Sequence, residues 1–570
     1  MSRKQQTERI FTPIESMSHF ATKIGKFGDK TAYRYFDKDR NLLSLTYRNL
    51  SAKILQQAAG YHAAGLAGKR IAVIGETSVE WVCSYVAAIA SGGVVIPMDR
   101  ELDVEQIKGF FTFAEVDAVV YSRSFNDKFA TLAKDHPTVS LQIPMAPVKG
   151  TWENEPTILP YAKLMEMGEE AVAAGYRYPE VTDLNRMVEM LFTSGTTGSS
   201  KCVMLSEKNI VSVVNSACAT VDFSPEDSIV SVLPIHHTYE LAIMISALNY
   251  GMNVAINDSI KHVLKNFALF QPTGLVLVPL FVSTMNKRIW DEARKGGKEA
   301  LLKNMTKISR ELRKINFDFR KTMFKQITSA FGGNLEKIVC GGAALNPELA
   351  ENFAEFGIEI YEGYGITECA PLIAVSPYYN PKKGSVGPAV PCCQVRIEAD
   401  HVNDKGYTEG EIQVKGDNVM LGYYKNPEET ANVFTDDGWF CTGDIGYMDN
   451  DGYIFITGRK KYVIVLENGK NVFPEEIEEY LDRIETVAES VVLGRKTEGS
   501  DEIVLTAIVY PQMDKFEDPK DHEKIEAEIR AQVAKMNKKL VSYKQIRNVT
   551  FRYEPFERTT SRKIKRHLIR

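Results

Sequence analysis

Apolar runs alternate with longer segments of mixed polarity along most of the chain. Residues 70–75 are RIAVIG, residues 79–90 are VEWVCSYVAAIA and residues 93–99 are GVVIPMD. This order predicts a strand, a helix and a second strand, with Thr77 and Glu80 as a capping box at the start of the helix. Because a helix separates the two strands, we expect a mostly parallel sheet with helices packed on its faces.

The same alternation returns after residue 187 and changes twice further along. The apolar runs MVEMLFT, SIVSVLP, GLVLVPLF and KIVCGG predict buried strands of a second α/β set. Residues 383–457 carry short strand-like runs with Gly and Asp turns, and the last hundred or so residues alternate charged amphipathic helices with apolar runs. We therefore predict an α/β protein with a large N-terminal domain, residues 1–460, and a small, mobile α+β C-terminal domain, residues 461–570. The N-terminal domain is expected to contain two mostly parallel α/β subdomains and a small β-rich subdomain.

Composition excludes several classes of function but does not identify one. The chain has 570 residues, a hydrophobic content of 44% and a net charge of −5, which give no reason to expect a nucleic-acid partner. Its eight cysteines show no paired C-x-x-C spacing, so neither a zinc site nor a disulfide framework is expected. No apolar window reaches the length of a membrane span and no leader-like run follows the N-terminus, which predicts a cytoplasmic protein.

A loop rich in glycine and hydroxyl side chains follows the run MVEMLFT. Residues 193–201 are TSGTTGSSK, in which glycines allow backbone N–H groups to converge and Lys201 supplies a positive charge. Such a loop is suited to a triphosphate, although a polar surface turn has a similar composition. Lys201 follows the second glycine by three positions, so the order departs from G-x-x-x-x-G-K-[ST] and disfavours a Walker-type nucleotidase.

Five motifs, in order and spread over roughly two thirds of the chain, resemble those of the adenylate-forming superfamily. That superfamily includes acyl-CoA synthetases, peptide-synthetase adenylation domains and luciferases, and the similarity is greatest to bacterial long-chain fatty acid–CoA ligases. The motifs are LFTSGTTGSSK (191–201), GGAAL (341–345), YEGYGITE (361–368), TGD with GR (442–444 and 458–459) and RTTSRKIK (558–565).

The resemblance implies ATP, Mg²⁺ and coenzyme A as the cofactor and co-substrates, and it assigns roles to individual residues. Tyr364 offers a face for adenine, Asp444 and Arg459 bind the ribose, and Glu368 holds Mg²⁺. Thr367 donates to the α-phosphate and Lys201 holds the outer phosphates. The other implied nucleotide-binding residues are Thr193, Ser194, Gly195, Thr196, Thr197, Gly198, Gly341, Gly342, Ala343 and Gly365.

The implied reaction explains the need for a second lysine at the far end of the chain. A carboxylate attacks the α-phosphate of ATP and expels pyrophosphate, and a thiol then attacks the acyl-adenylate. By resemblance Lys563 stabilises the charge that develops at the α-phosphate, delivered by the C-terminal domain. The alternative is a solvated basic tail, because Arg566 and Arg570 follow closely. Lys461 is the implied hinge residue about which that domain rotates.

The acid-binding side is less defined. His237, in the run HHTYE, is implied to orient the carboxylate or to gate the thiol tunnel. Glu240 is open to two interpretations, a specificity element that binds a substrate amine or a packed strand-end residue. The apolar stretches 241–248 and 275–282 are compatible with an acyl tunnel and equally with buried core.

A basic insertion interrupts the second α/β set. Residues 287–325 carry thirteen Lys or Arg against five Asp or Glu, with Phe317, Phe319, Phe324 and Ile327 interleaved. The insertion resembles the helical excursion of long-chain acyl-CoA synthetases. A weak peripheral contact with the inner face of a membrane is one hypothesis, and a solvated helix packed on its own domain is the other.

Three functions remain in competition. The first is a ligase that joins a carboxylic acid, a long-chain fatty acid in the leading version, to coenzyme A through acyl-AMP. The second keeps the adenylation and loads an acyl carrier protein. The third is a nucleotide-binding regulator without catalysis, which the presence of Lys563, Glu368 and Asp444 disfavours.

Overall fold

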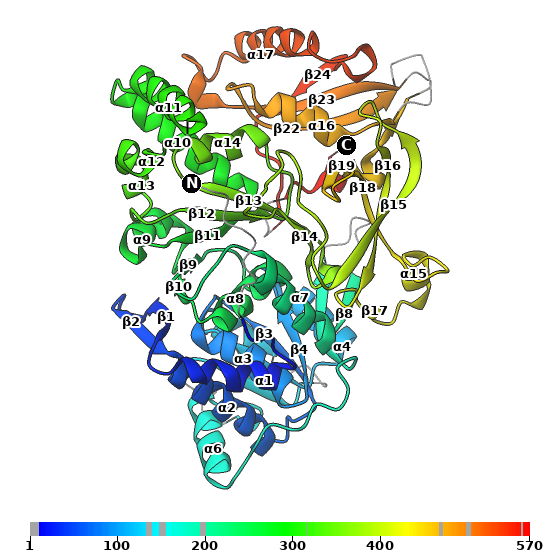
Figure 1. Cartoon of the computed structure of the whole chain (residues 1–570). Helices are drawn as coiled ribbons and strands as arrows, with labels where there is room; N and C mark the ends of the chain where they lie inside the picture. The colour runs from blue at the N-terminus through cyan, green and yellow to red at the C-terminus, as the bar shows by residue number, and fades with distance from the viewer. Residues whose placement is uncertain are drawn as a thin grey trace. The chain divides into compact units, whose positions relative to one another are not determined.

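The chain divides into two compact units. Figure 1 draws its helices and strands coloured from the N-terminus to the C-terminus. The computed structural model describes residues 11–132, 139–147, 155–193, 201–315, 317–466, 471–496, 503–559 and 563–569. Unit 1 comprises residues 1–394 and 414–440, and unit 2 comprises residues 395–413 and 441–570. The domain boundary between residues 460 and 461 stays a prediction.

The first predicted strand, helix and strand are present as β3 (Arg70–Ile74), α3 (Val79–Ala90) and β4 (Val94–Met98), with β3 and β4 parallel. The helix cap differs from the prediction. Ser78, in an extended conformation, caps α3 because its side chain accepts the backbone N–H of Trp81 at 3.1 Å. The predicted Thr77 and Glu80 box was therefore wrong by one residue. A capping box does form one helix later, between Asp103 and Gln106.

A seven-stranded sheet in unit 1 contains these strands. Its order is β17-β8-β7-β4-β3-β5-β6. The run from β7 to β6 is parallel, whereas β8 and β17 pair antiparallel at one edge. The other strands are β5 (Ala118–Tyr121), β6 (Leu141–Pro144), β7 (Met187–Thr193), β8 (Lys201–Ser206) and β17 (Gly422–Tyr423).

An eight-stranded sheet in unit 1 has the order β14-β13-β12-β11-β9-β10-β1-β2 and is parallel except at its two edge pairs. The predicted apolar run 274–281 is strand only as far as Leu277, because Pro279 occupies the first turn of a helix. The strands are β1 (Thr31–Phe36), β2 (Leu42–Thr46), β9 (Ser228–Ser231), β10 (Asn253–Ile256), β11 (Gly274–Leu277), β12 (Lys337–Gly341), β13 (Glu359–Gly365) and β14 (Leu372–Val375).

Helices cover these sheets, and the most apolar of them, α3, is almost wholly buried. In α3 every residue except Glu80 is buried, as expected of a helix that is hydrophobic on all sides. The other helices of unit 1 are α1 (Met17–Lys23), α2 (Tyr47–Ala63), α4 (Val104–Ala114), α5 (Asn126–Leu132), α6 (Tyr161–Ala173), α7 (Glu207–Thr220), α8 (Thr238–Tyr250), α9 (Val263–Phe270), α10 (Pro279–Lys295), α11 (Glu299–Lys314), α12 (Arg320–Met323), α13 (Lys325–Ser329), α14 (Pro347–Glu355) and α15 (Pro427–Asn432).

Unit 2 combines small sheets with two helices, α16 (Pro474–Asp482) and α17 (His522–Asn537). A four-stranded sheet, β15-β16-β18-β19, corresponds to most of the predicted β-rich region. Apolar side chains of α16 and α17 pack on a second sheet, β22-β23-β24. The strands are β15 (Cys393–Val402), β16 (Thr408–Gly416), β18 (Phe440–Met448), β19 (Ile454–Arg459), β20 (Ile464–Val465), β21 (Asn471–Val472), β22 (Val487–Lys496), β23 (Ile503–Pro511) and β24 (Asn548–Phe551).

The predicted fold class is confirmed, because unit 1 holds two mostly parallel sheets covered by helices and unit 2 mixes helices with small sheets. Across the described ranges, no helix combines the length and the apolar character needed to cross a membrane.

Candidate functional site

The predicted phosphate loop connects two antiparallel strands. Thr193 ends β7 and Lys201 begins β8, and the two residues are register partners. The Thr193 hydroxyl donates to the Lys201 carbonyl at 3.3 Å, so both ends of the loop lie on one rung of the sheet. The rest of the predicted loop, Ser194, Gly195, Thr196, Thr197 and Gly198, lies outside the described residues.

The Lys201 side chain is held by two residues from far along the chain. Its ammonium group forms an ion pair with Glu429 of α15 and lies 4.9 Å from the ring centroid of Tyr423. Tyr423 is placed there because β17 pairs with β8, which puts Tyr423 opposite Val203. A cation over an aromatic face gains electrostatic stabilisation, more so where the ring is buried as here.

Glu368, the predicted Mg²⁺ ligand, contacts the hydroxyl group of the same tyrosine. It occupies the short 3₁₀ turn η4 (Thr367–Cys369), and its backbone carbonyl accepts the N–H of Met420 at 2.8 Å. The Tyr423 hydroxyl donates to Glu368 Oε1 at 3.0 Å. Burial and the Glu368 carboxylate raise the pKa of Tyr423 well above its usual value, so this hydroxyl remains a donor.

We call Lys201, Glu368, Tyr423 and Glu429 the Tyr423 cluster. It brings together a predicted phosphate ligand and a predicted metal ligand that are 167 positions apart in the sequence. The donor set is compatible with Mg²⁺ and phosphate, because Mg²⁺ takes one or two carboxylates plus phosphate oxygens and Glu368 has a second oxygen beyond the one that Tyr423 binds. Sequence reasoning missed Tyr423 and Glu429. The aromatic pair after Gly422, in the run GYYKNPEE, was the available signal.

The predicted adenine side lies at the ends of two neighbouring strands. β12 and β13 are parallel, with Gly341 opposite Gly363, so Gly341 and Tyr364 meet at one edge of the eight-stranded sheet. Tyr364 is buried. Gly342 and Ala343 follow directly, and Gly342 has a φ of +85°, a conformation that glycine adopts without strain.

Gly365 shows why a glycine is needed beside Tyr364. A Cβ atom at this position would lie 2.0 Å from the carbonyl oxygen of Pro371, a clash with rigid backbone. The Ile366 N–H donates to the same carbonyl at 2.9 Å. Any side chain here would therefore displace the turn that leads into Thr367 and Glu368.

The His236–His237 pair precedes a helix rather than a strand end. His237 is the residue before α8, and its ring centroid lies 4.2 Å from that of His236. Burial and the positive charge of Arg100 lower the pKa of His236 to about 3, which keeps that imidazole neutral. Its Nε2 lies 3.6 Å from an Asp99 carboxylate oxygen. The implied role of His237 stays a prediction.

Glu240 is in the first turn of α8 and is only 3% exposed, so the strand-end placement was wrong. Ser231 donates a hydrogen bond to Glu240 Oε1. Burial raises the pKa of Glu240 to about 8, which keeps the carboxyl protonated at neutral pH. A neutral, buried acid favours the packed interpretation over an amine-binding one. The adjacent stretch 241–248 is core as well, since Leu241 and Leu248 are buried.

The predicted ribose pair lies in unit 2 and is formed locally. Asp444 of β18 and Arg459 of β19 are register partners, and Asp444 Oδ1 lies 2.6 Å from Arg459 Nε. Asp444 is buried, and the turn before it is fixed by Thr442, whose hydroxyl donates to the Ile412 carbonyl at 2.8 Å. Two planar groups with several donors and acceptors are thus fixed side by side, as sugar hydroxyl binding requires.

Lys461 follows the ribose pair directly in the 3₁₀ turn η5 (Lys460–Tyr462). Its ammonium group lies 4.4 Å from the centroid of the Tyr462 ring. Desolvation and the neighbouring Arg459 guanidinium lower the pKa of Lys461 to about 8. The hinge role of Lys461 stays a prediction.

Lys563 is exposed, yet its segment is anchored to unit 2. The Thr559 N–H donates to the Lys563 carbonyl at 2.8 Å, which closes a tight turn. Before the turn, Arg558 Nη2 lies 2.9 Å from Glu489 Oε1, and after it Arg566 forms an ion pair with Glu478. A solvated tail does not describe this segment, because acidic side chains of β22 and α16 hold it on both sides. These anchors were not predicted.

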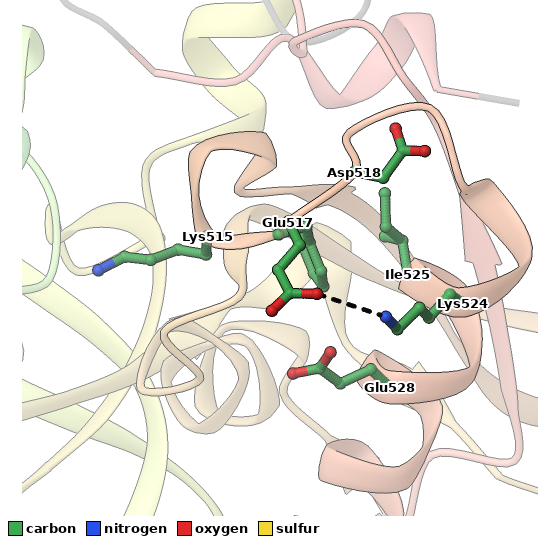
Figure 2. Close-up of a pocket in the computed structure, with 7 residues that line it drawn as sticks. Lys515, Glu517, Asp518, Lys524, Ile525 and Glu528 are labelled. Carbon is green, nitrogen blue, oxygen red and sulfur yellow. Dashed lines mark ion pairs between the residues drawn. The ribbon is translucent and has the colours of Figure 1, made fainter.

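A pocket elsewhere in unit 2 contains none of the predicted residues (Figure 2). It is lined by residues 515–518 and by Lys524, Ile525 and Glu528 of α17. Lys524 and Glu517 form an exposed ion pair at 3.9 Å across it. Exposed charges of both signs describe a solvated surface rather than a binding site.

Comparisons with known proteins define the class of this chain. The sequence model of the AMP-binding enzyme family matches residues 20–424, and that of the AMP-binding enzyme C-terminal domain matches residues 461–570. The chain belongs to the AMP-binding enzyme family. The predicted family is therefore confirmed.

Particular relatives carry more specific names. The chain is 30% identical over 448 residues to the long-chain-fatty-acid–CoA ligase FadD15 of Mycobacterium bovis, an alignment that covers 75% of this chain and 71% of the relative. It is 27% identical over 554 residues to the long-chain-fatty-acid–[acyl-carrier-protein] ligase AEE15 of Arabidopsis thaliana, covering 85% and 75%. Among solved structures it is similar to ATP-bound MatB from Rhodopseudomonas palustris, with a TM-score of 0.72, 26% identity and coverage of 96% and 98%.

Proposed function

We propose that this chain is an AMP-forming acid–thiol ligase that activates a long-chain fatty acid with ATP and transfers the acyl group to coenzyme A. One observation carries the proposal beyond the family itself. The Tyr423 cluster joins a lysine that ends a glycine-rich loop to a carboxylate that is suited to Mg²⁺. A site that binds a triphosphate together with its metal ion needs both groups within reach of one another.

The chemistry follows from the residues in their proposed roles. A carboxylate oxygen of the acid attacks the α-phosphorus of ATP, the bond to the bridging oxygen breaks, and pyrophosphate leaves with both electrons of that bond. Lys563 and Thr367 stabilise the charge at the α-phosphate oxygens, while Lys201 holds the outer phosphates. Glu368 would hold Mg²⁺, which would supply neutralisation of the phosphate charge. The thiol of coenzyme A then attacks the acyl carbonyl, loses its proton and displaces AMP.

The fatty-acid class rests on the relatives rather than on a measured tunnel. The first relatives are named long-chain-fatty-acid–CoA ligases and align over 75% of this chain. In the structure, Leu275 and Leu277 of β11 are buried in the core, as is most of α8. Their apolar character therefore belongs to folding and adds no evidence for acyl length.

A second acceptor has one specific observation behind it. The Arabidopsis relative named an acyl-carrier-protein ligase aligns over 85% of this chain, a longer stretch than the coenzyme A ligases do. Both acceptors present the same phosphopantetheine thiol. The alternative proposal is therefore the same first half-reaction followed by loading of a carrier protein. A silent regulator is disfavoured, because every charged residue implied in catalysis is present.

Pyrophosphate exchange tests the first half-reaction. The purified chain, incubated with ATP, Mg²⁺ and radiolabelled pyrophosphate, is expected to return label to ATP with saturated acids of about 12 to 18 carbons and not with acetate, benzoate or amino acids. Exchange with amino acids alone would contradict the fatty-acid assignment, and exchange with no acid would contradict the ligase. Coenzyme A and a phosphopantetheinylated carrier protein, offered separately to the pre-formed acyl-adenylate, then distinguish the two acceptors by mass.

A cytoplasmic location with peripheral contact at the inner membrane face is a further part of the proposal. Its support is the composition of the insertion, where basic residues outnumber acidic ones thirteen to five in a chain of net charge −5. Cell fractionation tests it, with the protein expected in the soluble fraction at high salt and partly with membranes at low salt.

A further inference from the structure

Lys563 belongs to a pair of short chain segments in unit 2 that are tied together by backbone hydrogen bonds. The Lys565 N–H donates to the Glu557 carbonyl and the Thr559 N–H donates to the Lys563 carbonyl, both at 2.8 Å. Because Lys563 lies in one of two paired arms, its backbone position depends on what holds the pair to the rest of unit 2. We call the two arms, residues 557–559 and 563–565, the lysine hairpin.

Both arms of the lysine hairpin are fastened to β22. Arg558 of the first arm donates from Nε and Nη2 to Glu489 Oε1 at 3.2 and 2.9 Å, and the Phe556 N–H donates to the other oxygen of that carboxylate at 2.8 Å. Ile564 of the second arm forms a β-bridge with Arg558 and packs with Phe556 against the buried Val491. Polar contacts therefore hold the first arm, and apolar contacts hold the second.

Arg566, three residues after Lys563, connects the second arm to two further elements. Its guanidinium forms an ion pair with Glu478 of α16, and the two side chains are only 12% and 13% exposed. Glu478 is itself held in place, because its Oε1 accepts the Val492 N–H at 2.6 Å. The same guanidinium lies 4.9 Å from the centroid of the Tyr462 ring. Arg566 thus contacts both α16 and the 3₁₀ turn η5.

The contacts of Arg566 lie between the predicted hinge and the predicted catalytic lysine. Tyr462 is the residue directly after Lys461. A guanidinium is planar, so one that pairs with a carboxylate and also lies over an aromatic ring has a defined orientation, which an ammonium group lacks. A buried ion pair contributes little net stability compared with apolar side chains of the same volume. The geometry of the Arg566 contacts, rather than their contribution to stability, is therefore the property to explain.

We propose that Arg566, held by Glu478 and Tyr462, is a positioning residue that fixes Lys563 relative to the hinge turn. Lys563 and the turn then move as one body when the C-terminal domain rotates about Lys461. The inference rests on the proposed function, because the adenylation reaction is what gives Lys563 its task. The competing explanation is an ion pair that stabilises the fold of unit 2 and has no effect on the reaction.

A double-mutant cycle in the full-length protein separates the two explanations. Arg566→Met is expected to lower kcat for fatty-acid-dependent pyrophosphate exchange about 10- to 30-fold, because a misplaced Lys563 stabilises the transition state poorly. The KM for ATP should stay within about twofold, since the predicted ATP-binding residues are unchanged. In a Lys563→Ala background the same substitution should cause less than about a twofold further loss, because a residue that acts through Lys563 has nothing left to position. Arg566→Lys, which keeps the charge opposite Glu478 without the planar face, should retain about a third of the parental rate.

Glu478→Gln tests the acidic partner of Arg566. It is expected to lower kcat about tenfold, because a neutral amide holds the guanidinium less firmly than a carboxylate does. The matched control is Glu476→Gln on the same helix, because Glu476 pairs with Lys544 at 2.8 Å and has no contact with the lysine hairpin among the described residues. This control is expected to exchange pyrophosphate at the parental rate.

Tyr462→Leu is a milder variant that leaves the Arg566 ion pair in place. Loss of the ring under the guanidinium is expected to lower kcat about three- to fivefold. Tyr480→Leu is its control, because Tyr480 lies in α16 with the Arg483 guanidinium 5.1 Å from its ring centroid. The control should leave kcat unchanged, since neither residue contacts Arg566 in the described part of the chain.

Two kinetic outcomes would overturn the proposal. One is a normal kcat in Arg566→Met, and the other is a loss that is as large in the Lys563→Ala background as in the parent, which would leave the ion pair a structural role only. Circular dichroism melting curves like that of the parent show that the variants are folded.

Amide hydrogen exchange of residues 557–565 tests the anchoring without turnover. Arg566→Met is expected to raise the exchange rate of this segment at least about fivefold, because the hairpin opens more often once its second arm is released. Unchanged protection would overturn the proposal. A parent that shows no pyrophosphate exchange with any acid, although Arg566→Met loses protection, would contradict the proposed function and still support the anchoring of Lys563 by Arg566.

Discussion

The Tyr423 cluster of unit 1 and the ribose pair of unit 2 both hold opposite charges together, but they are built differently. The cluster unites residues from position 201 to position 429, and Tyr423 reaches it only through the pairing of β17 with β8. The ribose pair joins Asp444 and Arg459 across one antiparallel hairpin, fifteen positions apart. One is a product of tertiary structure, and the other of local strand register.

The difference has consequences for a ligand. In the hairpin, Asp444 is buried and the partly exposed Arg459 is fixed beside it, so the pair is pre-organised. In the cluster, Lys201 is paired with the carboxylate of Glu429, and incoming phosphates must replace this carboxylate as the partner of Lys201. We therefore expect substitutions in unit 2 to cost binding directly, and substitutions in the cluster to act through the position of Glu368 and Lys201.

The largest expected effect is that of Lys563→Ala. Removal of a cation that stabilises a developing phosphate charge costs roughly 100- to 1000-fold in rate. Pyrophosphate exchange is the measurement. Lys565→Ala is the matched control, because Lys565 is two residues away and forms a partly exposed ion pair with Glu557 at 3.9 Å. This substitution should change the rate less than about threefold. Near-normal exchange in Lys563→Ala would remove Lys563 from the reaction.

Asp444→Asn tests the pre-formed pair. A hydrogen bond to an ionised group contributes about 1.5–3 kcal/mol, so the KM for ATP is expected to rise roughly 10- to 100-fold with a smaller change in kcat. The comparison is Asp451→Asn, an exposed aspartate in the turn before β19. An unchanged KM for ATP would show that the pair serves only the hairpin.

The buried carboxyl groups of Glu240 and Glu189 make the folding stability of unit 1 depend on pH. Burial raises the pKa of each to about 8, well above its value in the unfolded chain. The stabilisation from Glu240 is therefore complete below about pH 4.5 and is lost as the pH rises through 8. We expect the parent to lose roughly 2 kcal/mol more unfolding free energy than Glu240→Gln between pH 6 and pH 8. Parallel curves from urea denaturation would contradict the buried, protonated state.

Tyr423→Phe is expected to have a moderate effect, because it removes the hydrogen bond to Glu368 and keeps the ring under Lys201. Loss of one such hydrogen bond is expected to raise the Mg²⁺ concentration needed for half-maximal exchange about tenfold. Thermal stabilisation by Mg²⁺ and ATP, without any acid, provides a readout independent of turnover. Tyr424→Phe is the control, since that hydroxyl contacts Arg70 and Glu115 instead. Equal effects of both substitutions would assign Tyr423 a packing role only.

The smallest expected change in the first half-reaction is that of Lys461→Pro. If Lys461 is the hinge, fixing its φ should slow thioester formation several-fold and leave adenylate formation nearly intact. Rapid-quench assays of the two half-reactions measure this. Lys460→Pro is no substitute as a control, because Lys460 pairs with Glu411 at 2.7 Å, so Lys461→Ala is used. Equal loss of both half-reactions would contradict the hinge.

Strongly periodic segments were predictable from the sequence, and their errors are local. The run MVEMLFT is β7 to the residue, and α16 and α17 are charged amphipathic helices of the kind predicted for the last hundred or so residues. Apolar runs and helical periodicity act over a few residues, so a single sequence contains them. The predicted cap of α3 was one position too early, because the hydroxyl of Ser78 caps the helix. The predicted strand 274–281 was too long, because Pro279 starts α10.

The candidate site divides in the same way. The sequence by itself determined the family, the glycine-rich loop, the strand-end residues Gly341 and Tyr364, and the Asp444–Arg459 pair, because each is written in contiguous residues or in one hairpin. Only the tertiary structure decided that Tyr423 joins Lys201 to Glu368, that Glu240 is buried, and that acidic side chains anchor the segment of Lys563. It also decided which apolar residues of the insertion face solvent. Those outcomes depend on which distant elements pack together, and no local pattern contains that information.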